Sequence, residues 1–123
     1  MNIHGIYTDV HGELKGASVV FIHGFLLTSS VWKAVIPLLE PSIGAVSYDL
    51  RGAGNSDVGS GQYTLESYVD DLMAVLDKLK LKQTVLCGHE LGAHVAFRAA
   101  EREPKRIRGV LACNAAPGPV EDQ

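Results

Sequence analysis

The chain has 123 residues, 46% of them hydrophobic and 20% charged, with a net charge of −3 at pH 7. This predicts one globular domain with a modest core, and the slightly acidic balance gives no reason to expect a nucleic-acid partner. No apolar run approaches the roughly 20 residues that span a bilayer, so we expect no membrane association. Residues 1–5 lack the layout of a signal peptide, so we expect a cytoplasmic protein.

Three segments of the first half are rich in strand-forming residues: 2–10, 17–22 and 43–48. The first predicts one or two short strands at a sheet edge, whereas the other two are apolar enough for central parallel strands. Between them, Ser29 or Ser30 is expected to cap a short helix that reaches about Leu39 and is kinked or shortened by Pro37.

Helices and strands alternate in the second half: helix 65–80, strand 84–87, helix 91–102 and strand 107–113. Thr64 is the expected cap of the first helix, whose apolar residues recur at three- and four-residue steps. Cys87 and Cys113 fall in predicted buried strands and are expected to be reduced packing residues.

The alternation of strands and helices predicts an α/β fold in three layers, with a mostly parallel sheet and helices on both faces. We expect residues 1–116 to form a single domain. The turn-rich residues 117–123 are expected to form a flexible C-terminal tail.

Glycine-containing motifs follow three of the predicted strands, in this order: Phe21-Ile22-His23-Gly24-Phe25, then Tyr48-Asp49-Leu50-Arg51-Gly52-Ala53-Gly54-Asn55-Ser56, then Gly88-His89-Glu90-Leu91-Gly92. The third motif has the pattern Gly-X-nucleophile-X-Gly, a sharp turn from strand to helix that exposes the central side chain. Gly88 and Gly92 are required because such a turn leaves no room for a β-carbon. The central residue should be Ser, Cys or Asp, but here it is Glu90.

Together these motifs strongly resemble the α/β-hydrolase superfamily, in its esterase, lactonase, epoxide hydrolase and dehalogenase-like branch. The resemblance runs from about residue 3 to Ala116 and covers only the N-terminal half of the family's fold, which implies a half-size α/β-hydrolase fold. It implies an oxyanion hole formed by the backbone N–H groups of Phe25 and Leu91. Losing one such donor costs on the order of 3 kcal/mol of barrier.

The resemblance also implies supporting roles around the turn. His23, Gly24 and His89 would shape the site, and Asp49 and Arg51 would brace its floor. Neither a metal nor a cofactor is expected.

Three roles are open for Glu90. Its carboxylate could be a nucleophile, as Asp is in the dehalogenase and epoxide hydrolase branch, or a base toward water. Because Glu is one methylene longer than Asp, its carboxylate could instead fold back and plug the oxyanion hole by accepting from the Phe25 and Leu91 amides. None of the five histidines is favoured as a general base, and His94, one turn after Glu90, could pair with it or simply pack.

The main hypothesis is a hydrolase of small ester, lactone or epoxide-type substrates that uses Glu90. The alternatives are a non-catalytic protein that binds a small apolar ligand or a protein partner, and a fragment that needs a C-terminal half. Half of this fold is expected to expose an apolar face and an unpaired strand edge. We therefore expect a homodimer, in which a second copy covers both.

Overall fold

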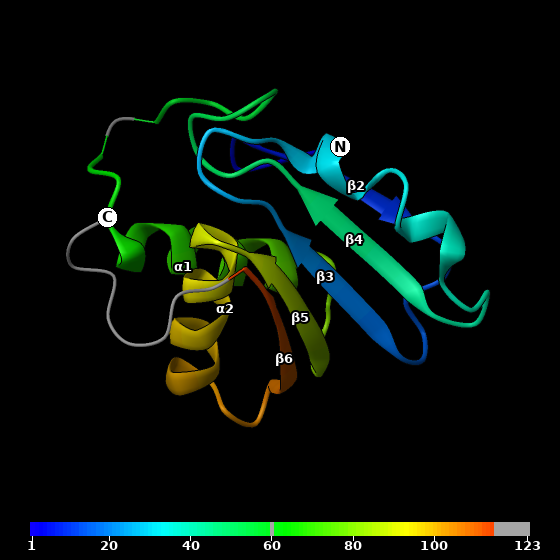
Figure 1. Ribbon diagram of the computed structural model, residues 1–123. Helices are drawn as coiled ribbons and strands as arrows, with labels where there is room; N and C mark the ends of the chain where they lie inside the picture. Colours follow the sequence, from blue (N-terminus) through cyan, green and yellow to red (C-terminus); the bar gives the residue numbers. More distant parts are fainter. Residues whose placement is uncertain (60, 115–123) are drawn as a thin grey trace.

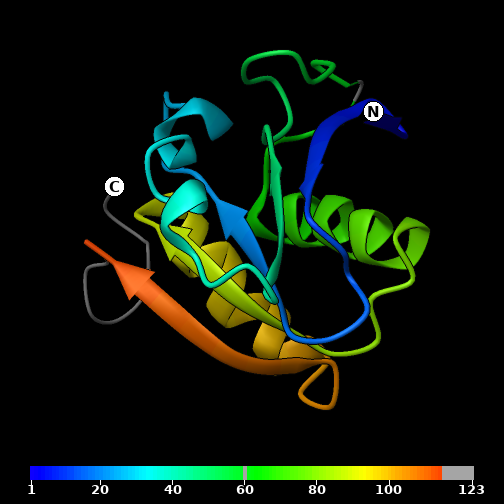
Figure 2. The same cartoon turned by 90° about the vertical axis from the view of Figure 1, so that its right-hand side faces the viewer.

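The structure is a computed structural model that describes residues 1–59 and 61–114 (Figures 1 and 2). The predicted tail 117–123 lies outside the described residues, as do the last residues of the predicted domain. No helix among the described residues is both long and apolar enough to cross a membrane.

The described residues form one sheet of six strands: β1 (Asn2–Ile3), β2 (Ile6–His11), β3 (Ser18–Ile22), β4 (Gly44–Tyr48), β5 (Thr84–His89) and β6 (Ile107–Cys113). Their order across the sheet is β1-β2-β4-β3-β5-β6. The pairs β1–β2 and β2–β4 are antiparallel, and the other pairs are parallel. The predicted, mostly parallel sheet is confirmed. The prediction that residues 2–10 form short strands at a sheet edge is also confirmed, since β1 and β2 lie there.

One face of the sheet carries both α-helices, α1 (Leu65–Lys78) and α2 (Leu91–Arg102), and the main core lies beneath them. Thr64 begins α1 as predicted. Its side chain accepts from the Ser67 N–H at 3.1 Å, and the Ser67 hydroxyl accepts from the Thr64 N–H at 2.9 Å. This reciprocal capping satisfies two donors that a helix start otherwise leaves unpaired.

Among the described residues, the other face carries only two short 3₁₀ turns, η1 (Ser29–Trp32) and η2 (Ile36–Leu38), so the short helix predicted there is broken into two pieces. Pro37 lacks an N–H and its ring clashes with the preceding turn, which prevents a continuous α-helix. The cap is also not a serine, because the Thr28 side chain accepts from the Ser30 N–H at 3.2 Å. Trp32 packs beneath η1 on the Phe21 ring, with ring centroids 4.9 Å apart.

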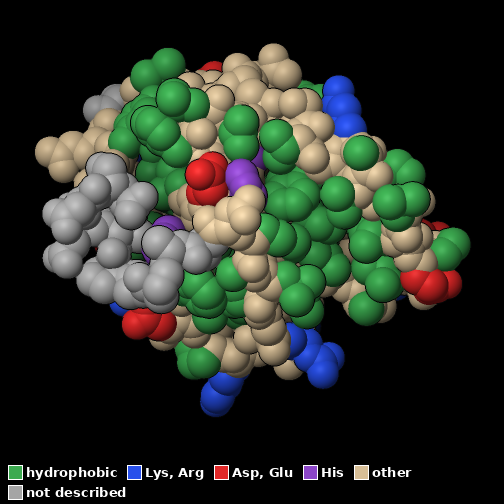
Figure 3. All heavy atoms as spheres, viewed as in Figure 1, with side chains coloured by type: hydrophobic (Ala, Val, Ile, Leu, Met, Phe, Trp, Pro, Cys, Tyr) green, Lys and Arg blue, Asp and Glu red, His purple; other side chains and the backbone are tan. Residues whose placement is uncertain are grey.

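The face beneath η1 and η2 is only partly covered. Leu111 on β6 is 58% exposed and Leu38 is 84% exposed, and hydrophobic side chains spread broadly over this side of the molecule (Figure 3). Within the described residues, β6 pairs with β5 alone. Cys113 was predicted to be buried, but it is exposed because no described strand lies beyond β6; both cysteines are free, and Cys87 is buried as expected.

Candidate active site

The loops that follow β3, β4 and β5 meet at the carboxyl end of the sheet, because these strands are parallel. Each of these loops carries one of the three motifs, and the turn between β5 and α2 carries Glu90. The Glu90 backbone has φ +51° and ψ −114°, in a region that non-glycine residues rarely occupy. The turn is therefore strained at the residue that the motif places in its centre.

The two glycines that flank this turn have no room for a side chain. A β-carbon on Gly88 would collide with the backbone of Gly92, and one on Gly92 would collide with the carbonyl oxygens of Ile22 and His23. The obstacles are backbone atoms, which cannot rotate away. The start of α2 is thus held directly against the end of β3, as the spacing of the glycines predicted.

The Glu90 carboxylate is half-exposed, with 53% of its side-chain surface accessible. Its Oε1 lies 3.6 Å from His89 Nδ1 and only 2.7 Å from the position that a β-carbon on Gly24 would take. Among the described residues, neither the Phe25 nor the Leu91 N–H donates to this carboxylate. The folded-back, plugging arrangement considered from the sequence is therefore not the one in the structure.

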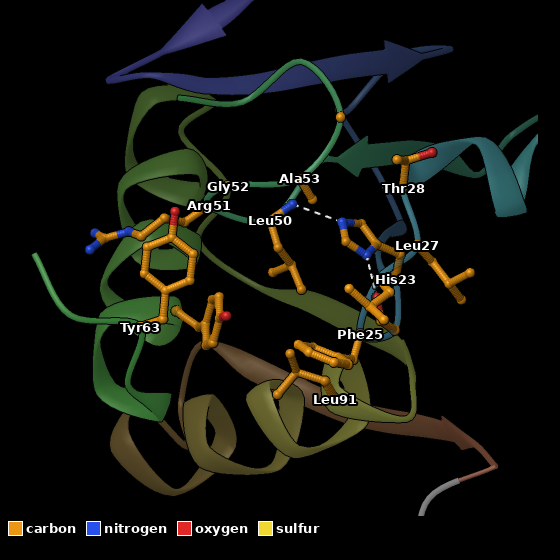
Figure 4. Close-up of a pocket in the computed structure, with 14 residues that line it drawn as sticks. His23, Phe25, Leu27, Thr28, Leu50, Arg51, Gly52, Ala53, Tyr63 and Leu91 are labelled. Carbon is orange, nitrogen blue, oxygen red and sulfur yellow. Dashed lines mark hydrogen bonds between the residues drawn. The ribbon is translucent and has the colours of Figure 1, made fainter. Parts of the chain in front are cut away.

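Phe25 and Leu91 line one cleft of about 360 Å³ and lie next to each other at one end of it (Figure 4). Their N–H groups donate to no other described residue. The remaining lining is largely apolar, with Leu26, Leu27 and the rings of Tyr63 and Tyr68. Glu90 is not part of the lining but adjoins it, since Gly24 and Leu91 both belong to the cleft.

His23 is buried and holds two loops together. Its Nδ1 lies 2.7 Å from the Gly24 carbonyl oxygen, and its Nε2 accepts from the Leu50 N–H at 2.8 Å (Figure 4). Since Nε2 accepts, the ring proton sits on Nδ1 and donates to Gly24. Burial lowers the pKa of this imidazole. Both nitrogens are engaged, so His23 supports the site and has no free lone pair with which to act as a base.

Asp49 is also buried, and its carboxylate accepts hydrogen bonds from two backbone N–H groups. Its two oxygens accept from the Ser29 N–H at 2.8 Å and from the Asn55 N–H at 2.9 Å. Arg51 forms two parallel hydrogen bonds of 2.9 Å with the Asp71 carboxylate. Asp49 thus connects the loop after β3 with the loop after β4, and Arg51, which lines the cleft, connects the loop after β4 with α1.

The remaining histidines do not meet at Glu90. His4 and His11 lie in the β1–β2 region, and His94 forms no ion pair with the Glu90 carboxylate within the described residues. The sequence reasoning missed Asn114, whose Nδ2 lies 3.3 Å from His89 Nε2. The available signal was its position, since it directly follows the parallel strand next to β5 and so falls at the same edge of the sheet.

Comparison with known proteins agrees with this geometry. Residues 17–123 match the family model described as the alpha/beta hydrolase fold. The chain belongs to the α/β-hydrolase-fold family. It is 32% identical to a strigolactone esterase of Pisum sativum, over 85% of this chain and 40% of that protein. It is 34% identical to an epoxide hydrolase of Caballeronia sordidicola, over 88% of this chain and 34% of that protein.

Solved structures of the family superpose closely on the fold. A thermophilic esterase from Thermogutta terrifontis gives a TM-score of 0.86 at 32% identity, covering 95% of this chain and 43% of that one. An enol-lactonase from Burkholderia xenovorans LB400 gives 0.84 at 28% identity, covering 90% and 44%. The chain spans 40% and 34% of the two curated relatives named above.

Proposed function

We propose that this α/β-hydrolase-fold chain hydrolyses a small ester, lactone or epoxide-type substrate and that Glu90 is its reactive carboxylate. The observation that carries the proposal is the placement of Glu90. Its carboxylate is exposed on a strained turn, beside a cleft in which two backbone N–H groups have no partner among the described residues. Relatives that are named as an esterase and an epoxide hydrolase support the same class of reaction.

For an ester, the proposed roles follow from these positions. The substrate carbonyl oxygen accepts from the Phe25 and Leu91 N–H groups, which stabilise the charge that develops there. Glu90 takes a proton from a water molecule, and the water oxygen bonds to the carbonyl carbon. When the intermediate collapses, the ester C–O bond breaks and the leaving oxygen takes the proton from Glu90, giving an acid and an alcohol.

With an epoxide, the same carboxylate could instead attack a ring carbon, which breaks the ring C–O bond and forms a covalent ester; the freed oxygen takes a proton from water, and a second water then hydrolyses the ester. The two routes differ in where the oxygen of water ends up. In a single turnover in H₂¹⁸O, direct attack by water puts the label in the product alone. The covalent route puts it in Glu90 when water cleaves the ester at the Glu90 carbonyl carbon, and mass spectrometry of the peptide that contains Glu90 separates the two.

The cleft favours a neutral, apolar substrate. Its lining is dominated by aliphatic and aromatic side chains, and its one guanidinium, that of Arg51, is occupied by Asp71. A substrate carboxylate would have to compete with that ion pair. Acetate esters and unsubstituted lactones or epoxides are therefore the first substrates to assay.

The test compares the wild type with Glu90→Gln, which keeps the shape of the side chain but removes its charge. Glu13→Gln is the matched control, because Glu13 is exposed and lies outside the cleft. We expect multiple turnovers in the wild type and the control, and none in Glu90→Gln. Turnover that survives in Glu90→Gln would remove Glu90 from the mechanism.

The non-catalytic alternative is less well supported, because it requires Glu90 to occupy the amide pair. If it held, Glu90→Ser would lower the free energy of unfolding, since the hydrogen bonds from the amides to the carboxylate would be lost. If the carboxylate lies outside the amide pair, we expect the free energy of unfolding of Glu90→Ser to match that of the wild type within about 0.5 kcal/mol.

We also propose that the chain forms a homodimer. The support is the β6 edge, which is open within the described residues, together with the exposed Leu111 and Leu38 on the same partly covered side. A twofold axis would bring the same edge of two copies together and cover the apolar side chains of both. Light scattering across a dilution series tests this, and a folded monomer at tens of micromolar would overturn it.

A further inference from the structure

Three side chains at the β5–α2 turn form a chain of contacts: Asn114, His89 and Glu90. We propose that Asn114 fixes the ring proton of His89 on Nδ1 and thereby aims an N–H donor at the Glu90 carboxylate. Asn114 and His89 are then positioning residues for the reactive group. This inference rests on the proposed function only for its catalytic consequence, since the contacts themselves can be tested in an inactive protein.

The backbone brings Asn114 to this place. In the β5–β6 register, His89 lies opposite Cys113, and the Glu90 N–H donates to the Cys113 carbonyl oxygen at 3.0 Å. The last residue of β6 is thereby tied to the turn. Asn114 follows with φ +53°, a left-handed conformation that Asn and Asp tolerate better than most residues. Its amide group reaches the His89 ring, with Nδ2 at 3.3 Å from Nε2.

The position of the ring proton follows from the chemistry of the amide. An amide nitrogen is only a donor, so Nε2 of His89 must accept, and a neutral imidazole then carries its proton on Nδ1. Nδ1 is buried and has no hydrogen-bond partner among the described residues. A buried N–H without an acceptor is unfavourable, so this donor is available to any acceptor that comes within reach.

The Glu90 carboxylate is an acceptor close to this donor. Its Oε1 is 3.6 Å from Nδ1, slightly beyond hydrogen-bond range, and its half-exposed side chain can rotate to close the gap. Hydrogen bonds at such sites often shorten only when a substrate binds. A bond to Oε1 would fix the orientation of the carboxylate and leave Oε2 free to face water or substrate.

This arrangement gives His89 a definite role. A nitrogen that already carries a proton cannot accept one, so His89 is a donor to Glu90 and not the general base. Glu90 then remains the group that accepts a proton or attacks the substrate. The sequence predicted only a general supporting role for His89. Its contact with Asn114 supports a specific role, the donation of the Nδ1–H to Glu90.

The test is the tautomer of His89, read from two-bond ¹⁵N–¹H correlation spectra of ¹⁵N-labelled protein at alkaline pH. Asn114→Asp is the informative variant, because Asp tolerates the same backbone conformation but its carboxylate can only accept. We expect the proton on Nδ1 in the wild type and on Nε2 in Asn114→Asp. Gln83→Glu, the same change from amide to acid at an exposed site outside the turn, should leave the wild-type spectrum unchanged.

A wild-type proton on Nε2, or a tautomer that does not respond to Asn114→Asp, would overturn the inference. So would a change of tautomer that leaves the ¹³C resonance of the Glu90 carboxylate unmoved, because His89 would then not act on Glu90. These readouts need no substrate. If the wild type hydrolyses nothing, the proposed function fails while the NMR result still decides the inference.

In an active wild type we expect Asn114→Asp to lower kcat about tenfold with little change in KM, the effect of one hydrogen bond to a charged group. A change in KM alone would indicate a role in substrate binding and would contradict positioning of the reactive carboxylate.

Discussion

The close approach of α2 to β3 can be tested by adding a single methyl group. Gly92 is the second residue of α2, and its β-carbon in Gly92→Ala would lie 2.7 Å from the His23 carbonyl oxygen and even closer to that of Ile22. Gly92 does not have a positive φ, so the conformation itself suits Ala. The expected effect is therefore one of space.

The magnitude follows from two opposing contributions. An extra methyl group in a well-packed site costs about 1–3 kcal/mol, and the upper end applies here because both obstacles are backbone carbonyls. Ala is favoured over Gly in a helix by up to about 1 kcal/mol. We expect a net loss of about 2 kcal/mol in the free energy of unfolding. For a domain of this size, that lowers Tm by about 8 °C.

The assay is urea unfolding followed by the fluorescence of Trp32, the chain's single tryptophan, with far-UV circular dichroism as a second probe. Gly109→Ala is the control, since a β-carbon at that position in β6 meets nothing within 4 Å. We expect the control to stay within about 0.5 kcal/mol of the wild type. If Gly92→Ala were equally stable, the packing of α2 on β3 described above would be wrong.

Three further predictions concern side chains around the site. Burial lowers the pKa of His23 in the folded state, so the unfolded chain takes up a proton first as the pH falls. The free energy of unfolding of the wild type should therefore decrease below roughly pH 6.5. His23→Gln, though less stable, should lose this part of the pH dependence in urea titrations between pH 7 and 5. The pKa of the Cys87 thiol is raised to about 11, mainly by burial and also by the neighbouring Cys113. Iodoacetamide at pH 8 should therefore label the exposed Cys113 much faster than Cys87, as measured by mass spectrometry. Equal labelling rates would contradict this difference in burial. Arg51→Lys cannot keep both hydrogen bonds to Asp71. We expect it to lower the free energy of unfolding, measured in urea, by about 1.5 kcal/mol. An unchanged free energy of unfolding would show that the paired hydrogen bonds are not stabilising.

Most of the fold could be predicted because its signals are local. The apolar segments at 17–22, 43–48, 84–87 and 107–113 each became a strand, and the Thr64 cap began its helix where expected. The break at Pro37 was also predicted. The serine cap was wrong, because Thr28 begins η1. The burial of Cys113 was wrong because it depends on whether anything lies beyond β6, which the composition of a strand does not reveal.

The site, too, has one feature that local sequence predicts and one that depends on distant neighbours. The glycine spacing predicted a tight turn, because the need for space at Gly88 and Gly92 is a property of the backbone path itself. The contact between Asn114 and His89 could not be predicted, because it depends on the exact β5–β6 register and on a left-handed residue after β6. An Asn after a strand is common, and the role of Asn114 follows only from its contact with the His89 ring.

Gly24 explains how the turn accommodates Glu in place of a shorter side chain. A β-carbon on Gly24 would fall 2.7 Å from Glu90 Oε1 and 2.8 Å from His89 Nδ1, so the missing side chain leaves the space in which these two groups meet. Glu90 Oε1 lies in this space, and among the described residues neither the Phe25 nor the Leu91 N–H donates to it. The backbone of the turn can therefore keep its strained geometry while the carboxylate lies beside His89. A side chain at position 24 would take this space, so the present position of the Glu90 carboxylate depends on Gly24.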